Sequence, residues 1–298
     1  MTVPPGAGTS NETGTPTCFR HPGRETYVSC VRCGRPACPD CLRSAAVGQQ
    51  CVDCVRDGNR GVRRAAGAFG GRPTSSAIVT WTLVGVNVLL YIVELAHASL
   101  GNDWAMLGGA ISGNQVIGVA AGQWYRLITS AFLPPPGLSG LGPVDIIFNM
   151  WALIIVGPSI EHMLGRLRYL AVYLISGIGG SVAFYFLAPA NEAALGASGA
   201  IFGLFGAWFV LSRRQGLSSR GVVMVIGLNL VLDFVFPGIA WQAHVGGLLA
   251  GCLLTAAYVY APRQNRALVQ GAATVALLAT AVICVVVRDY QLVGSVQF

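Results

Sequence analysis

Charged side chains are scarce in this chain, and lysine is missing altogether. Only 10% of the 298 residues are charged, and all 19 basic residues are arginine. A soluble domain carries about 25% charged residues, so a water-exposed globule with a mean hydropathy of +0.61 would lack the polar surface to stay dispersed. A lipid bilayer is therefore the expected solvent. Ten of the arginines precede residue 73, so the net charge of +7 describes a basic N-terminal region and argues against nucleic-acid binding.

The start of the chain lacks the pattern of a cleavable signal sequence, in which charged residues precede an apolar stretch. Residues 1–17 are instead rich in proline, glycine, threonine and serine, a composition that buries too little apolar surface to fold. These residues are therefore predicted to form a disordered tail.

Large apolar side chains are also nearly absent between residues 18 and 54, so hydrophobic burial alone cannot fold this segment of 37 residues. Seven of the nine cysteines fall here with one histidine, in four pairs that each enclose two residues: Cys18 and His21, Cys30 and Cys33, Cys38 and Cys41, and Cys51 and Cys54. Eight such ligands are the number that two closed tetrahedral zinc sites need, and metal binding would supply most of the stability. A disulfide framework is the alternative, but seven cysteines cannot all pair.

The segment resembles the cross-braced B-box and RING-like zinc modules, in which alternate pairs share an ion. The resemblance implies one ion held by Cys18, His21, Cys38 and Cys41 and a second held by Cys30, Cys33, Cys51 and Cys54, although the spacing alone leaves sequential pairing open. Four protein ligands at each site leave no position for water, so both zinc ions are expected to be structural, and no cofactor is expected in catalysis. Reduced thiols predict a cytoplasmic module. Its closed sites and arginines suggest that it recruits a cytoplasmic protein partner or positions substrates.

Seven apolar runs follow a stretch rich in arginine and glycine. Each run is near the ~20 residues that an α-helix needs to cross ~30 Å of hydrocarbon, although the second and fifth are short. The runs cover residues 77–98, 144–161, 168–188, 193–212, 221–237, 239–260 and 267–287. The sequence therefore predicts an all-α polytopic membrane protein that begins with a small zinc-stabilised module.

Arginines mark every second connection of these runs. They precede the first run and join the second to the third, the fourth to the fifth and the sixth to the seventh: Arg63, Arg64, Arg72, Arg166, Arg168, Arg213, Arg214, Arg220, Arg263 and Arg266. The positive-inside rule then predicts a multi-pass protein of the cell membrane with its N-terminus in the cytoplasm and its C-terminus outside. The first outer connection, residues 99–143, is long and half apolar, and it is predicted to dip into the membrane interface.

Polar side chains inside spanning helices are energetically expensive, so the few that are present are functional candidates. Ser198 lies in a Gly-Ala-Ser-Gly string near the start of the fourth run, and His244 lies in the sixth. A histidine within hydrogen-bond reach can take the proton of a serine hydroxyl, and a helix N-terminus favours the negative charge that then develops. Small residues would let the two helices pack closely: Gly199, Gly203 and Gly206 on one, and Gly247 and Gly251 on the other.

Each of these signals also has an ordinary explanation. A Gly-x-Ser-Gly string is expected by chance about 0.2 times in a chain of this length with 39 glycines, a single histidine can be a packing residue, and small-residue faces are common in helix packing. Two other polar residues, Glu94 and Asp233, lie toward the outer ends of their runs, where their side chains are expected to reach the interface. The pair of Ser198 and His244 therefore carries the prediction, provided that the two helices touch.

The membrane part resembles the rhomboid family of intramembrane serine proteases, through four motifs in the family's order. The string Gly122 to Leu127, Gly-Gln-Trp-Tyr-Arg-Leu, is similar to the Trp-Arg motif of the first outer loop. Three further strings match the asparagine motif, the Gly-x-Ser-Gly motif and the histidine helix: Phe148-Asn149, Gly196 to Gly199, and Ala243-His244 with Gly247 and Gly251.

The resemblance implies a rhomboid six-helix catalytic core, residues 77–262, that cuts transmembrane proteins with a serine–histidine dyad and no third acid. Ser198 would be the nucleophile and His244 the general base, with Asn149 and the Ser198 backbone N–H as oxyanion donors. Arg126 and Glu161 would hold the outer loop and the helix ends. The remaining predicted parts are the tail 1–17, the zinc module 18–56, a flexible linker 57–76, and a seventh transmembrane helix with a C-terminal tail, 263–298.

One position departs from the family's pattern. Four residues before Asn149 the family commonly has a histidine, whereas this chain has Asp145. An ionised carboxylate accepts hydrogen bonds and repels an oxyanion, and the loss of one oxyanion donor typically costs ~10²-fold in rate, so a weaker protease is expected. The alternative function is a catalytically silent relative that binds membrane clients. A transporter is poorly served by so few charged groups at mid-membrane.

Overall fold

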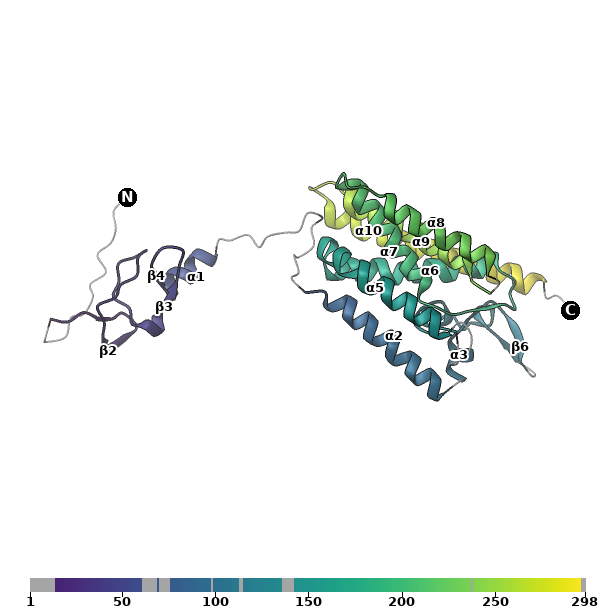
Figure 1. Cartoon of the computed structure of the whole chain (residues 1–298), viewed down its shortest axis with the longest axis horizontal. Helices are drawn as coiled ribbons and strands as arrows, with labels where there is room; N and C mark the ends of the chain where they lie inside the picture. Colours follow the sequence, from purple (N-terminus) through teal and green to yellow (C-terminus); the bar gives the residue numbers. More distant parts are fainter. Residues whose placement is uncertain are drawn as a thin grey trace. The chain divides into compact units, whose positions relative to one another are not determined.

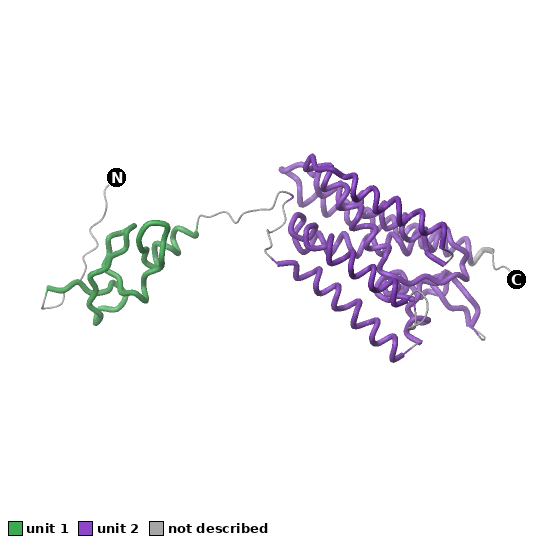
Figure 2. Tube along the Cα trace, in the orientation of Figure 1, with its two compact units in different colours: residues 1–64 green, residues 65–298 purple. Residues whose placement is uncertain are grey.

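The structure is a computed structural model that describes residues 14–60, 69, 76–97, 99–112, 115–135, 142–236 and 238–295. Most of the predicted tail and linker, with Arg63, Arg64 and Arg72, lies outside the described residues. The chain forms two compact units, residues 1–64 and residues 65–298, which Figure 2 distinguishes by colour.

The first unit consists of short strands around a core of cysteines. Its elements are β1 (Thr17–Cys18), β2 (His21–Glu25), the 3-10 helix η1 (Pro39–Cys41), β3 (Leu42–Ser44), β4 (Gln49–Cys51) and α1 (Val52–Arg60). β1 pairs antiparallel with β2, and β3 pairs antiparallel with β4. Among the described residues of this unit, the buried core contains five cysteines, Ala37 and Leu42. Since Leu42 is its one large aliphatic side chain, this core is as poor in apolar volume as the composition predicts.

The second unit is a bundle of long helices, and within the described residues each of the seven predicted apolar runs forms one. The helices are α2 (Ile78–Ala96), α5 (Gly142–Leu164), α6 (Arg166–Leu187), α7 (Ser198–Arg214), α8 (Arg220–Val235), α9 (Trp241–Tyr260) and α10 (Arg266–Ser295) (Figure 1). Five of them, α2, α5, α6, α9 and α10, are long and apolar enough to cross a membrane, whereas α7 and α8 contain 17 and 16 residues. The predicted class, a mostly helical polytopic membrane protein with an N-terminal Cys/His module, is confirmed.

Several helices differ in length from their apolar runs, and two of these differences bear on the site. The second run appears short in the sequence, but α5 contains 23 residues because it begins at Gly142 and continues to Leu164. The fourth run begins at residue 193, whereas α7 begins at Ser198, because Ala193–Ala194 form β8 and pair with β5 (Met106–Leu107). Gly196 follows this strand with a φ of 139°, a backbone conformation that favours glycine. The strand and this glycine therefore lead the chain into α7.

Glycines allow α7 and α9 to touch through their backbones. A Cβ atom placed on Gly247 of α9 would lie 1.9 Å from the carbonyl oxygen of Gly199 on α7. A Cβ atom placed on Gly251 would lie 2.2 Å from the carbonyl oxygen of Gly203. No side chain larger than hydrogen fits at these distances without a shift of one helix. The predicted close contact between the glycine faces of these two helices is therefore confirmed.

The connection between α2 and α5 folds into a layer of short elements at one end of the bundle (Figure 1). Besides β5, it contains α3 (Ser99–Trp104), β6 (Ala110–Ser112), β7 (Gln115–Ile117), the 3-10 helix η2 (Val119–Ala121), α4 (Arg126–Thr129) and the 3-10 helix η3 (Ser130–Phe132). β6 and β7 form an antiparallel pair on which Ile111 and Val116 are 79% and 62% exposed. Exposed apolar side chains suit contact with lipid, but the depth of this connection in the membrane interface stays a prediction.

Candidate active site and metal centres

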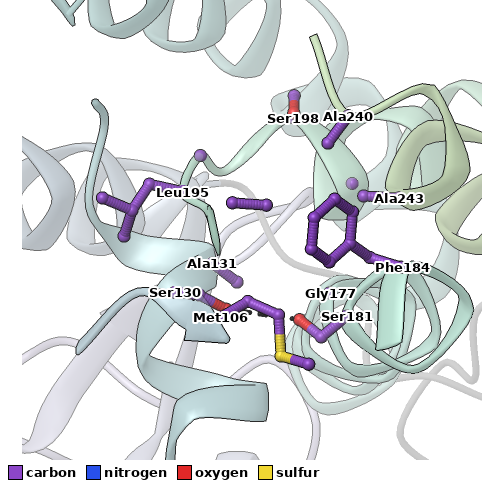
Figure 3. Close-up of a pocket in the computed structure, with 14 residues that line it drawn as sticks. Met106, Ser130, Ala131, Gly177, Ser181, Phe184, Leu195, Ser198, Ala240 and Ala243 are labelled. Carbon is purple, nitrogen blue, oxygen red and sulfur yellow. Dashed lines mark hydrogen bonds between the residues drawn. The ribbon is translucent and has the colours of Figure 1, made fainter. Parts of the chain in front are cut away.

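Ser198 is the first residue of α7 and lines a small open hollow in the bundle (Figure 3). Its side chain is partly exposed, so the hydroxyl can be reached. The first N–H groups of an α-helix have no carbonyl partner within the helix, and this end of the helix carries a partial positive charge. A negative charge that develops beside Ser198 would therefore be stabilised by α7.

The turn that leads into Ser198 is held by the connection between α2 and α5. The Gly196 N–H donates to the Ser130 carbonyl oxygen at 3.0 Å, and β8 pairs with β5 just before this turn. On the opposite side of the hollow from Ser198, the Ser130 and Ser181 hydroxyl oxygens lie 3.3 Å apart (Figure 3). The position of Ser198 is therefore set by the preceding connection as well as by its own helix.

His244 lies in the first part of α9, is 7% exposed, and packs against the face of α7 that carries Ser198. The Phe202 ring, one helical turn after Ser198, stacks on the imidazole with a centroid distance of 4.1 Å and an interplanar angle of 9°. A Cβ atom on Gly199 would lie 3.2 Å from the Ala243 carbonyl oxygen, so the sequence neighbours of the two candidates also face each other. No hydrogen bond joins Ser198 to His244 among the described side chains; such bonds often form only when substrate binds.

The hydrogen-bond partner of His244 is an acid on a third helix. The His244 Nδ1 atom lies 2.7 Å from Oδ2 of Asp233, near the C-terminal end of α8, with side-chain exposures of 8% and 3%. The expectation that Asp233 and Glu94 reach the interface is wrong, because these residues are only 7% and 1% exposed. Asp233 points inward because its partner is the buried imidazole. One signal in the sequence points to Asp233, because it is an aspartate in an otherwise apolar run, but the sequence does not identify His244 as its partner.

Asn149 and Asp145 lie one turn apart on α5, beside the start of α7. The Asp145 carboxylate contacts the Asn149 amide and is near enough to His244 to interact with it electrostatically. A Cβ atom on Gly196 would lie 3.4 Å from Ser198 Oγ and 3.6 Å from Asp145 Oδ2, so the hydroxyl and the carboxylate flank the same point. Asp145 Oδ2 is buried and has no hydrogen-bond partner among the described residues. The residue that departs from the family's pattern thus faces the candidate nucleophile.

Arg126 ties together three parts of the connection between α2 and α5. It is 2% exposed, and its guanidinium donates to the carbonyl oxygens of Asn102 and Ala105 at 2.8 and 2.9 Å and to Gln123 Oε1 at 2.7 Å. Hydrogen bonds to charged groups are stronger than those between neutral groups. Arg126 therefore joins three parts of this connection through hydrogen bonds.

Glu161 of α5 caps the start of α2. Its carboxylate accepts hydrogen bonds from the backbone N–H groups of Val79 and Thr80 at 3.1 and 2.9 Å, and from the Thr80 hydroxyl at 2.9 Å. A carboxylate at a helix N-terminus satisfies N–H groups that lack intrahelical partners and complements the helix dipole. Glu161 is 0% exposed, so it joins α5 to α2 from within the bundle.

The first unit brings the eight predicted metal ligands into two clusters. In each cluster the ligand atoms all lie within 4.8 Å of one another. The first contains Cys18, His21, Cys38 and Cys41, and the second contains Cys30, Cys33, Cys51 and Cys54. This is the alternate pairing that the resemblance to cross-braced modules implies, and the sequential pairing left open by the spacing does not occur.

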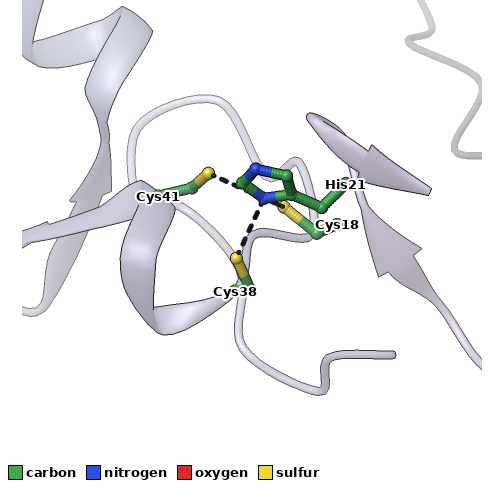
Figure 4. A group of neighbouring side chains, drawn as sticks. All are labelled: Cys18, His21, Cys38 and Cys41. Carbon is green, nitrogen blue, oxygen red and sulfur yellow. Dashed lines mark hydrogen bonds between the residues drawn. The ribbon is translucent and has the colours of Figure 1, made fainter. Parts of the chain in front are cut away.

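The distances within the clusters fit a tetrahedral ion. Zinc bonds of ≈ 2.3 Å to sulfur and ≈ 2.0–2.1 Å to nitrogen imply about 3.6 Å between sulfur and nitrogen and about 3.8 Å between two sulfurs. The His21 Nδ1 atom lies 3.4 to 3.8 Å from the three Sγ atoms of its cluster (Figure 4). In the other cluster, the Cys33 and Cys51 Sγ atoms lie 3.8 Å apart. We therefore interpret these contacts as edges of ligand tetrahedra and not as hydrogen bonds between thiols.

Hydrogen-bond donors favour the thiolate form of Cys30 and Cys33 in the second cluster. The Cys51 N–H donates to Cys30 Sγ at 3.1 Å, and Arg35 Nε donates to Cys33 Sγ at 3.4 Å. Burial by itself would raise the pKa of the Cys30 thiol, but backbone N–H groups, led by that of Cys51, outweigh it and lower this pKa to about 6. Because the thiolate is the form that binds metal, the donor set fits a metal ion.

The sequence model of the rhomboid domain family matches residues 121–261 of this chain. The matched part extends from η2 to the end of α9, and it includes Asp145, Asn149, Ser198 and His244. It leaves out the first unit, α2 and α10.

Several curated proteins are similar in sequence. YdcA of Bacillus subtilis, whose name places it among the rhomboid proteases, is 37% identical over 144 residues, which cover 47% of this chain and 69% of YdcA. The rhomboid protease GluP of the same bacterium is 32% identical over 192 residues, which cover 63% of this chain but only 35% of GluP. The rhomboid protease AarA of Providencia stuartii is 26% identical over 221 residues, which cover 63% of this chain and 75% of AarA.

Proposed function

Because this chain belongs to the rhomboid family, we propose that it is an intramembrane serine endopeptidase that cuts transmembrane proteins. One observation carries the proposal: Ser198 begins α7 beside a hollow, and the imidazole of His244 packs on the same face of that helix. A nucleophile, a base and a helix N-terminus are the groups that hydrolysis of a peptide bond needs. The rhomboid proteases among the relatives support the same activity.

In the proposed reaction, Ser198 Oγ attacks the carbonyl carbon of the scissile peptide bond while His244 Nε2 takes the hydroxyl proton. The carbonyl oxygen becomes an oxyanion, which the Asn149 amide and the Ser198 backbone N–H stabilise. The proton then passes from Nε2 to the leaving amine as the carbon–nitrogen bond breaks and an acyl-enzyme forms. A water molecule, deprotonated by His244, releases the second product and restores the serine.

The substrates are transmembrane segments that reach Ser198 from the bilayer. The reaction site lies at the end of the bundle that carries the connection between α2 and α5, since α7 and α9 both begin there (Figure 1). The arrangement of arginines supports an N-terminus in the cytoplasm and a C-terminus outside the cell membrane, which puts cleavage near the outer face.

The two Cys/His clusters of the first unit are proposed to hold one structural zinc ion each. Zinc would be bound by His21 Nδ1 with three thiolates in the first cluster and by four thiolates in the second, which gives closed sites without an open position for water. When bound, the ions supply folding energy and no chemistry to the reaction. We propose a cytoplasmic protein partner or a substrate-positioning role for this module.

A second candidate function is favoured by Asp145. Its carboxylate contacts the Asn149 amide, the proposed oxyanion donor, and one of its buried oxygens has no hydrogen-bond partner among the described residues. An ionised carboxylate there would repel an oxyanion. The alternative is therefore a rhomboid-like protein that binds membrane clients with little or no cleavage.

The deciding experiment uses the purified full chain in liposomes with a reporter whose transmembrane segment is rich in small residues. We expect the parent to cleave the reporter and a fluorophosphonate probe to label it at Ser198, and we expect both signals to disappear in Ser198→Ala. Ser219→Ala is the matched control, because Ser219 also stands at a helix N-terminus and makes no cap hydrogen bond. Equal cleavage by the parent and Ser198→Ala would reject Ser198 as the nucleophile of the proposed protease. Binding of the reporter without cleavage or labelling would support the silent relative.

A further inference from the structure

We propose that Asp233 is a positioning residue that orients His244 and stabilises its charged form during the reaction, so that the site works as a serine–histidine–aspartate arrangement. The inference rests on the proposed protease function and deepens it. The acid comes from α8, the base from α9 and the nucleophile from α7, so three neighbouring helices each contribute one member. The family resemblance implies a dyad without a third acid, and the proposal changes that expectation for this chain.

The geometry assigns separate tasks to the two imidazole nitrogens. Nδ1 of His244 lies 2.7 Å from Oδ2 of Asp233, a distance at which Nδ1 carries a proton and donates it to the carboxylate. The neutral imidazole then has its lone pair on Nε2, the nitrogen that must accept the Ser198 proton. Phe202 stacks on the ring at 4.1 Å and restricts its tilt. The hydrogen bond and the stacked ring together fix both the tautomer and the orientation of the base.

When ionised, Asp233 and His244 each need the other as a partner of opposite charge. His244 is the fourth residue of α9, and Asp233 is the third from the end of α8. A helix N-terminus disfavours a positive charge and a helix C-terminus disfavours a negative one, so neither ionised side chain is stabilised by its own helix. Both are also shielded from water, with side-chain exposures of 8% and 3%, and a buried charge needs a partner. Each is therefore the compensating group for the other.

The rest of α8 gives no packing explanation for an inward aspartate. Asp233 is the one buried residue of this helix, and its neighbours Val231, Phe234 and Val235 are 59%, 71% and 62% exposed. A carboxylate placed for solubility would point outward with them. The other charged group near His244 is Asp145 on α5, which lies on the oxyanion side and contacts Asn149. Asp233 is thus the acid that is bound to the base itself.

During the reaction, the hydrogen bond from His244 Nδ1 to Asp233 remains in place while the imidazole gains a positive charge. As Ser198 Oγ bonds to the substrate carbon, its proton moves to Nε2, and the imidazolium that results stays bonded through Nδ1–H to the Asp233 carboxylate. The carboxylate remains ionised, and the Nε2 proton later leaves with the amine product. In soluble serine proteases, replacement of the corresponding aspartate by asparagine lowers kcat by ~10⁴-fold, because the imidazole then takes the wrong tautomer.

The test compares Asp233→Asn and Asp233→Ala with the parent in liposomes. Two rates are measured: fluorophosphonate labelling of Ser198, which needs the base but no transmembrane substrate, and cleavage of the reporter. We expect both variants to lose about 10²-fold or more in labelling rate and in kcat, with KM changed less than about twofold. Glu94→Gln is the matched control, because Glu94 is another buried acid near the C-terminal end of a helix, and its carboxylate oxygens have no hydrogen-bond partner among the described residues.

The outcomes separate this inference from the proposed function. If the parent protein is never labelled at Ser198, the protease proposal is rejected, and the proposed role of Asp233 is rejected with it. A labelled parent with variants that react at the parent's rate would overturn the role of Asp233 alone. Full rescue by asparagine after loss by alanine would also overturn it, because a neutral tether would then suffice.

A second measurement does not depend on a folded variant at position 233. In ¹⁵N-histidine-labelled Ser198→Ala protein, the His244 resonances, assigned by their loss in His244→Gln among the four histidines, are expected to show a proton on Nδ1 and none on Nε2 at neutral pH. A neutral ring protonated on Nε2 would overturn the proposed orientation.

Discussion

The buried side chains of residues 17–60 are mostly cysteines, whereas the centre of the membrane bundle consists of glycine backbones in contact and of aliphatic and aromatic side chains. In the first unit, two clusters of ligand atoms occupy the places where apolar side chains would otherwise pack. In the second, a hydrogen at Gly247 or Gly251 is what allows two helices to touch. One chain therefore contains a unit stabilised by ligand chemistry and a unit stabilised by close packing.

Inside the bundle, buried polar groups differ in how much of their hydrogen-bonding capacity is used. Arg126 and Glu161 each make several hydrogen bonds to backbone groups, so their bonding capacity is used for structure. Asp145 retains a buried oxygen without a partner among the described residues, and His244 has one nitrogen that is not bonded to Asp233. Satisfied polar groups stabilise a fold, while groups with unused capacity are available for chemistry.

Metal removal is the strongest way to test the contrast between the units. Chelation of the intact protein is expected to unfold residues 17–60, because structural zinc contributes ~10–16 kcal/mol in small zinc-binding peptides, more than such a small core can supply. Hydrogen exchange measured by mass spectrometry should show complete loss of protection in this unit and unchanged protection in α5 to α9. A module that stays protected without metal would show that its core folds without the ions.

The complementary test adds a single methyl group to the bundle. Gly247→Ala would place a Cβ atom 1.9 Å from the Gly199 carbonyl oxygen, so α7 and α9 must separate. We expect a loss of ~3 kcal/mol, the upper part of the usual range for overpacking, seen as a lower melting temperature in detergent. Gly227→Ala on α8 is the control, because nothing lies within 4 Å of its Cβ position. Equal melting temperatures for the two variants would show that the helices are not in contact.

A smaller loss is expected when a satisfied polar group is removed. Glu161→Ala leaves the Val79 and Thr80 N–H groups without their acceptor at the start of α2, which should cost ~2 kcal/mol, the middle of the range for unsatisfied buried groups. The melting temperature should fall while the rate of Ser198 labelling per folded molecule stays within about twofold. Glu192→Ala, at an exposed position, is the control. A variant with normal melting but slow labelling would place Glu161 in the chemistry instead.

Much of the architecture could be predicted from the sequence, because its signals are local or repeat along the chain. The seven apolar runs correspond to the seven helices, and the Cys/His spacing identifies the ligands of both clusters. The alternate grouping of the ligands came only from a resemblance, because spacing fixes which residues bind and not which of them share an ion. The start of α7 at Ser198 required the β5–β8 pairing, which joins segments more than eighty residues apart.

The part of the site that the sequence could not provide is the direction of its side chains. Asp233 and Glu94 occupy similar depths in their runs, and both were expected at the interface, yet both are buried and Asp233 alone meets the imidazole. The rotation of a helix about its axis decides such contacts, and an apolar run with little periodicity does not report that rotation. The contact of Phe202 with His244 is hidden for the same reason, and only the structure shows that the two rings stack.

The smallest expected effect concerns Asp145, whose unused hydrogen-bonding capacity lies beside the proposed oxyanion donor. Asp145 is half-buried beside Asn149, and its buried Oδ2 atom lacks a partner among the described residues, so it contributes little to stability, and its charge would oppose the oxyanion. Asp145→His replaces an acceptor with a donor and should raise kcat by about tenfold, ~1.4 kcal/mol of transition-state stabilisation, with no fall in melting temperature. Asp145→Asn should give a smaller gain, because it removes the charge but introduces a donor on a shorter side chain. If both variants are slower than the parent, Asp145 assists the reaction, as a protonated carboxyl group that donates to the oxyanion would.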